Sequence, residues 1–205
     1  ENPYQKFLFS QEEFKNDQIT YLNFFQTSNT VLNRILIFFN LLKFRIFGYR
    51  VFHLHWFFNF IPPKETRILL FLNTIYIYLF LFSIKVLGYK LIWTVHNIFP
   101  HEKIVLDNLA FTKYVTALAN KLIFHSLSSL NEFDSLYKIK NKSVIIQMGN
   151  VISIFEPTET PKITKTKLKI PVNSFVYLFF GQIKPYKGIL DLIKVFKVLE
   201  NEHPS

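Results

Sequence analysis

Residues 179–192 read FFGQIKPYKGILDL and combine the end of a predicted strand, a loop bounded by two glycines and the start of a predicted helix. The strand covers residues 174–180, SFVYLFF, and its apolar, β-forming side chains are typical of a strand that is covered on both faces. Gly181 follows where the backbone must turn sharply, and Gly188 stands where the helix begins. This order predicts a strand–loop–helix unit of an α/β protein.

The loop of this unit has the composition of a phosphate-binding site. Lys184 and Lys187 lie between the two glycines, and Pro185 stiffens the turn. Backbone N–H groups and the helix dipole favour an anion at a helix N-terminus, and lysine adds a full positive charge. Because the spacing is not that of the Gly-x-x-x-x-Gly-Lys-Ser/Thr loop, the sequence does not predict a nucleotide hydrolase. We predict that Gly181, Lys184, Lys187 and Gly188 bind phosphate groups.

Strand-like and helix-like runs alternate along the rest of the chain, which is typical of α/β proteins. We expect parallel strands near residues 51–55, 90–95, 121–125 and 143–147, and the strand at 174–180 in a separate sheet. We expect helices at residues 2–14, 29–44, 68–88, 107–120 and 132–137. The last helix follows Ser128, Ser129 and Asn131, which are candidate N-caps because their short side chains accept hydrogen bonds from a first helical turn.

Residues 155–171, FEPTETPKITKTKLKIP, form the predicted linker. They contain three prolines, several threonines and many charged side chains, a composition typical of an interdomain connection. We therefore assign residues 1–154 to a first domain and residues 172–205 to the start of a second. The chain begins with Glu1 and stops just after a predicted helix, so we expect it to be a fragment of a longer protein.

The composition restricts the partners and the compartment. The chain has 24 Lys and Arg against 14 Asp and Glu, and its net charge of +10 predicts an anionic partner. Nucleotide-sugar phosphates and an anionic membrane surface meet this condition. Nucleic acid is disfavoured because the charges are scattered and no recognisable nucleic-acid-binding module is present. The hydrophobic content of 50% excludes a disordered chain, and the absence of cysteine from the sequence excludes disulfides and thiolate metal sites and fits the cytoplasm.

Residues 68–88, ILLFLNTIYIYLFLFSIKVLG, allow two interpretations. Their length and uncharged middle suffice for a membrane-spanning helix. Against a span, Asn73, Thr74 and Ser83 interrupt the apolar run, and a predicted strand follows at once, which is the rhythm of a soluble sheet. We favour a helix that packs on the sheet and lies partly on a membrane surface, so that attachment is peripheral.

Two histidines stand near the end of the first predicted strand, where open α/β sheets collect their ligands. His53 and His55 alternate with apolar residues, so they share one face of the strand. Two histidines at this spacing could hold a metal, but no third ligand of suitable type stands nearby in the sequence. We therefore predict that both are structural.

A third histidine ends the predicted strand at residues 90–95. His96 could be an ordinary loop histidine, but Asn97, His101 and Glu102 follow it within one loop. This concentration of polar groups at the carboxyl end of a strand favours a functional role.

Four stretches, in order, resemble family 4 glycosyltransferases, which have the GT-B fold. Residues 179–193, FFGQIKPYKGILDLI, resemble the first strand–loop–helix of the donor-binding domain of that family. Residues 90–102, KLIWTVHNIFPHE, resemble the strand and His-Asn loop of its acceptor domain, and residues 53–56 (HLHW) and 123–126 (IFHS) stand where the family has strand ends. The resemblance implies two doubly wound Rossmann-like domains, the first without its first strand and the second present only as its first strand–loop–helix.

The resemblance also implies a function, the transfer of a sugar from a nucleotide-sugar donor to a glycan or lipid-linked acceptor in the synthesis of cell-surface polysaccharide. His96 would lie near the transferred sugar as the catalytic residue, while Lys187, supported by Lys184, would stabilise the departing diphosphate in the loop with Gly181 and Gly188. The implied residues on the acceptor side are Asn97, His101 and Glu102. No metal and no cofactor are implied because lysines meet the phosphates. We therefore expect a cytoplasmic protein that attaches peripherally to the inner face of the plasma membrane.

The chain departs from the family pattern at two positions. Gln182 stands where the family has an arginine after the loop glycine, and Met148 replaces the histidine of a His-Gly-Asn sequence. Lys184 could supply the charge that Gln182 lacks. The alternative function is that of a non-catalytic membrane-surface or nucleotide-binding protein, and we expect the fragment alone to be inactive as an enzyme.

Overall fold

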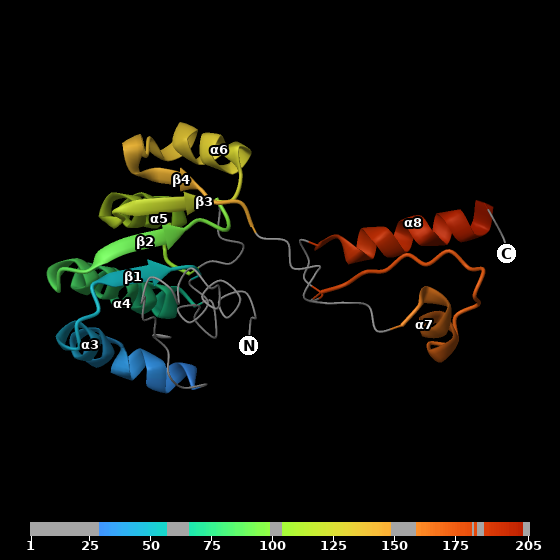
Figure 1. The fold of residues 1–205 in the computed structure, drawn as a ribbon, viewed down its shortest axis with the longest axis horizontal. Helices are drawn as coiled ribbons and strands as arrows, with labels where there is room; N and C mark the ends of the chain where they lie inside the picture. Colours follow the sequence, from blue (N-terminus) through green and yellow to red (C-terminus); the bar gives the residue numbers. More distant parts are fainter. Residues whose placement is uncertain are drawn as a thin grey trace. The chain divides into compact units, whose positions relative to one another are not determined.

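The computed structural model describes residues 29–56, 66–98, 104–148, 159–181, 183 and 187–202 (Figure 1). The chain divides into two compact units, Glu1–Gly149 and Asn150–Ser205, and each is described by itself. The predicted helix at residues 2–14 lies outside the described residues.

Four parallel strands form one sheet in the first unit, in the order β1-β2-β3-β4 (Figure 1). The strands are β1 (Val51–Leu54), β2 (Lys90–Thr94), β3 (Lys121–Phe124) and β4 (Ser143–Ile145). His53 lies beside Ile92, and Ile92 lies beside Lys121, so the carboxyl ends of neighbouring strands meet at one edge of the sheet. The α/β class and the four strands predicted at these places are confirmed.

A helix precedes the first strand, and helices connect each strand to the next, as parallel pairing requires. They are α3 (Thr30–Ile46) before β1, α4 (Arg67–Val86), α5 (Asn108–Leu118) and α6 (Leu127–Tyr137), with the short 3-10 helix η2 (Lys140–Lys142) before β4. The side chains of Thr66, Asp107 and Ser126 accept hydrogen bonds from the first turns of α4, α5 and α6.

Helix α6 begins at Leu127 rather than at residue 132, so the predicted start and caps are wrong. The Oγ atom of Ser126 accepts a hydrogen bond from the backbone N–H of Ser129, at 3.2 Å. Strand β3 ends only two residues earlier, at Phe124, and Ser126 is the first side chain after it that can cap a helix. The predicted caps Ser128, Ser129 and Asn131 therefore lie inside the helix.

The core of the first unit lies between one face of the sheet and helices α3 to α6. Phe133 of α6 is fully buried and lies edge-to-face against Trp93 of β2, at 5.8 Å between ring centroids, and against Phe124 of β3, at 5.3 Å. Phe80 of α4 makes the same kind of contact with Phe52 of β1. These aromatic contacts connect three strands to two helices.

Helix α3 packs on α4 and is held there by side chains that donate to backbone carbonyls. The hydroxyl of Tyr76 in α4 donates to the carbonyl of Arg34, at 2.9 Å. The buried hydroxyl of Tyr89 donates to the carbonyl of Leu41, at 2.7 Å. Burial raises the pKa of Tyr76 to about 12, so its hydroxyl keeps its proton and remains a donor throughout the physiological range.

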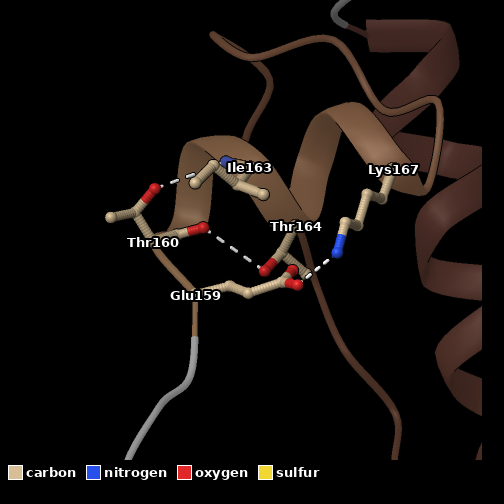
Figure 2. A network of polar contacts seen from close by, with 5 residues as sticks. All are labelled: Glu159, Thr160, Ile163, Thr164 and Lys167. Carbon is tan, nitrogen blue, oxygen red and sulfur yellow. Dashed lines mark hydrogen bonds and ion pairs between the residues drawn. The ribbon is translucent and has the colours of Figure 1, made fainter.

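The second unit contains helices α7 (Pro161–Lys167) and α8 (Ile189–Glu202). Helix α7 lies within the predicted linker. Figure 2 shows this helix: at its start the Thr160 hydroxyl accepts a hydrogen bond from the backbone N–H of Ile163, and Glu159 forms an ion pair with Lys167 at its end. Proline at the first helical position fits this start because its missing N–H would have no helical partner there.

The strand predicted at residues 174–180 is wrong for the part of the chain that the structure describes. Residues 175–180 follow α7 without forming a strand, and no strand among the described residues pairs with them, which a hydrogen-bonded ladder would require. The ring of Tyr177 instead lies edge-to-face on Phe196 of α8, at 4.9 Å, whereas Phe175 and Phe180 are largely exposed.

We expect Phe133→Ala to destabilise the chain strongly. It removes a fully buried ring that contacts two strands, and such substitutions cost about 3–5 kcal/mol. Phe71→Ala is the matched control, because Phe71 on α4 is 52% exposed and its loss should cost less than about 0.5 kcal/mol. Urea unfolding measures both variants, and equal losses would contradict the position of the core.

Candidate functional site: a histidine cluster at the strand ends

Four of the six histidines gather at the carboxyl edge of the sheet. His53 belongs to β1, whereas His55, His96 and His125 directly follow β1, β2 and β3. Side chains alternate between the two faces of a strand, and the register places His53 on the same face as Thr94, opposite to the face that carries Trp93. One face therefore holds the apolar core and the other presents the imidazoles.

Hydrogen bonds fix the orientation of these rings. The His53 Nε2 atom lies 2.8 Å from the Thr94 hydroxyl, which is almost fully buried. The Nδ1 atom of His55 lies 3.3 Å from Nε2 of His96, so one imidazole donates and the other accepts. His125 donates from Nδ1 to the carbonyl of Ile146, at 2.8 Å, which places its proton on that nitrogen.

Ring stacking completes the cluster. The indole of Trp56 lies flat on the imidazole of His96, with 4.1 Å between centroids and 13° between planes. The ring of His125 lies 5.1 Å from that of His96, and the rings of His53 and His55 lie 4.1 Å apart. His96 is thus held between an aromatic plane and two other imidazoles, with part of its surface open to solvent.

Burial lowers the pKa of three of these histidines, His53, His55 and His96, so their imidazoles are neutral at neutral pH. Desolvation lowers the pKa of His53 to about 4. Desolvation, followed by the proximity of His53, His96 and His125, lowers the pKa of His55 to about 3. Desolvation, with the nearby His125 and His53, lowers the pKa of His96 to about 4. A neutral imidazole can both donate and accept a hydrogen bond but carries no charge.

The cluster predicts a stability that falls with acid. The unfolded chain binds protons below a histidine's ordinary pKa of 6.5, but the folded cluster resists them until about pH 4, so stability is present above pH 6.5 and is lost towards pH 4. Between pH 7.5 and 5 we expect a loss of about 1–3 kcal/mol, a range discounted for the solvent that reaches His96. Urea unfolding at several pH values measures it. His55→Gln removes one titrating group and should flatten the slope; an unchanged slope would show that His55 does not titrate as described.

Of the other site residues predicted in the first unit, only Asn97 belongs to the described residues. Asn97 follows His96 at the same edge and is exposed to solvent. The predicted acceptor-side residues His101 and Glu102 lie outside the described residues. Across the described ranges, no group of three or more His, Cys, Asp or Glu side chains is arranged to hold a metal ion.

In the second unit, both glycines of the predicted phosphate loop belong to the described residues. Gly181 has φ +128° and Gly188 has φ +64°, two conformations that L side chains rarely adopt. The ammonium of Lys187 lies 3.0 Å from the position that a Cβ atom on Gly181 would occupy, so the missing side chain makes room for this charge. Gly188 immediately precedes α8 at Ile189. Lys184 lies outside the described residues.

The sequence interpretation missed the extent of the cluster. It predicted a structural role for His53 and His55 and assigned no chemical role to His125 or to Thr94. The available signal was positional, because each histidine lies in or directly after a parallel strand, where ligands collect in open α/β sheets. What a sequence does not provide is the register that brings these strand ends level.

A comparison of the sequence with protein-family models finds no match, and a comparison with curated proteins finds no match either.

Proposed function

We propose that the chain is part of a glycosyltransferase of the GT-B type, which moves a sugar from a nucleotide-sugar to a glycan or lipid-linked acceptor. The observation that carries the proposal is the geometry of the loop before α8. There, Gly181 and Gly188 have positive φ, the ammonium of Lys187 lies beside Gly181, and Gly188 immediately precedes α8, an arrangement suited to a diphosphate at a helix N-terminus.

The proposed reaction needs stabilisation of the leaving group more than covalent catalysis. As the bond between sugar and diphosphate breaks, negative charge grows on the departing oxygen. A cation and backbone N–H groups fixed near that oxygen bind the transition state more tightly than the ground state. Lys187 has this role in the proposal, supported by the N-terminus of α8.

The proposal gives His96 a hydrogen-bonding role near the sugar. With a pKa of about 4, its imidazole is a weak base at neutral pH and is poorly suited to remove a proton from a sugar hydroxyl. The same neutral ring can accept a hydrogen bond from one hydroxyl or donate one to another. Its stacking on Trp56 and its contact with His55 limit its rotation, so that it can orient a substrate.

Lys187→Ala should weaken the binding of nucleoside diphosphates. A charge-assisted hydrogen bond is worth roughly 1.5–3 kcal/mol, so we expect an affinity about ten- to a hundredfold lower, measured by calorimetry with a panel of nucleoside diphosphates. Lys187→Arg should recover only part of the loss because a planar guanidinium does not replace a compact ammonium. Lys197→Ala, which removes an exposed lysine of α8, is the control. Unchanged affinity in Lys187→Ala would refute the diphosphate site.

His96→Ala should have the opposite profile. Because His96 lies at the edge of the sheet in the first unit and not in the loop with Lys187, nucleotide affinity should be preserved while the rate of sugar transfer falls, by about tenfold or more for a lost orienting contact. Transfer from labelled nucleotide-sugars to glycan and lipid-linked acceptors measures the rate. Nucleotide binding that depends on Lys187, without transfer to any acceptor, would favour the alternative of a non-catalytic nucleotide-binding protein.

A further inference from the structure

An exposed apolar stripe runs along α3. Its members follow the helical repeat of three and four residues, and one of them, Phe39, is 64% exposed. The stripe consists of Leu32, Ile35, Phe39, Leu42 and Ile46. The opposite side of α3 buries Ile37 and Leu41 in the core. The helix is therefore apolar on two sides. One side packs against the rest of the unit, and the other remains exposed.

Helix α4 has the same two-sided character. Leu70, Ile77 and Phe80 are among the residues that face the core. A second set of side chains, spaced by three or four residues, remains exposed; it consists of Ile68, Leu72, Ile75, Leu79, Phe82 and Val86. Solvated helices normally present polar residues at such positions.

The two stripes form one surface. Phe38 and Leu42 of α3 and Phe82 and Val86 of α4 line the same open groove, which has a volume of about 290 Å³. The two helices also run in the same direction, since Tyr76 in the middle of α4 contacts Arg34 near the start of α3, and Arg45 near the end of α3 contacts Leu87 just after α4. The exposed stripes are therefore parallel neighbours, and we call them together the α3–α4 surface.

The charged side chains of α3, of α4 and of the strands that follow them have a single sign, whereas Asp107 at the start of α5 lies near Tyr78 of α4. Residues 29–56 and 66–98, which include α3 and α4, contain no Asp and no Glu. They contain seven bases, which are Arg34, Lys43, Arg45, Arg50, Arg67, Lys85 and Lys90. Lys43 lies over the rings of Phe44 and Phe47, 5.9 Å from each centroid, so a cation and apolar rings stand together at the end of α3.

We propose that the α3–α4 surface docks on an anionic lipid bilayer. Its exposed apolar side chains enter the boundary between headgroups and acyl chains, and its bases contact the lipid phosphates. The bases of the last turns, Lys43 and Lys85, lie next to the starts of β1 and β2, whereas the histidine cluster lies at the opposite, carboxyl edge of the sheet. Docking through this surface therefore leaves the cluster uncovered. The inference does not depend on the transferase proposal.

The structure argues against two alternative explanations of this surface, which are a membrane-spanning helix and a dimer interface. Helix α4 is long and apolar enough to cross a membrane, but Ile77, Phe80 and Leu81 are fully buried in the core, and a span would expose that core. A second copy of the chain would bring two surfaces of the same positive charge together without a carboxylate from either helix to neutralise them.

Flotation of the full chain with vesicles tests the proposal. We expect binding to an equal mixture of phosphatidylcholine and phosphatidylglycerol, weak binding to phosphatidylcholine alone, and release by high salt or carbonate. The double variant Phe39→Gln with Phe82→Gln should bind at least about tenfold more weakly, since it removes one large side chain from each stripe. Leu109→Gln with Leu127→Gln, on α5 and α6, is the control with a similar loss of exposed apolar surface and should bind normally.

A second pair of variants separates charge from apolar contact. Lys43→Gln with Lys85→Gln should weaken binding to the anionic vesicles about 10- to 30-fold, whereas Lys113→Gln with Lys121→Gln, two exposed lysines elsewhere in the unit, should have little effect. Failure to bind anionic vesicles, equal losses in the controls, or retention after carbonate would overturn the proposal. So would a dimer, detected by light scattering, that the Phe39→Gln and Phe82→Gln variant dissociates.

Discussion

The parallel backbone pairing of β1, β2 and β3 is the constraint on which the first unit depends. A parallel ladder fixes which residues lie side by side, and the alternation of side chains then assigns each to a face. With His53 beside Ile92, one face receives Leu54, Trp93 and Leu122 for the core. The other face receives the imidazoles. A shift of one residue in β2 would move Trp93 out of the core and His96 out of the cluster at the same time.

The cluster has an energetic cost that the core offsets. Keeping a histidine neutral and partly buried stabilises nothing by itself, because an exposed imidazole would be solvated more favourably. The bond between His53 and the buried Thr94 hydroxyl satisfies polar atoms, and the aromatic packing of Phe133 against Trp93 and Phe124 stabilises the other face of the sheet. Polar groups assembled at the expense of core stability are typical of sites that bind ligands.

Sequence reasoning was most successful where the pattern is local and repeated. The runs at β1 to β4 are apolar and separated by helical segments, so both the strands and the parallel class could be predicted. It failed where a structure depends on a neighbour. Residues 174–180 have the composition of a buried strand, yet a strand exists only with a partner, and composition does not show whether one is adjacent. The hydrogen bond between His55 and His96 could not be predicted for the same reason, because it joins residues 41 positions apart in the sequence.

Helix α4 shows why its sequence allowed two interpretations. Leu70, Ile77 and Ile84 repeat every seven residues and face the core, while Leu72, Leu79 and Val86 repeat every seven residues and face outwards. Superimposed, the two stripes give an apolar run long enough to cross a membrane, although neither stripe alone would. The hydropathy of this segment therefore results from two contacts on two sides of one helix. The core-facing stripe is apolar because it packs against the sheet. The fold of this unit does not explain why the outward-facing stripe is apolar as well.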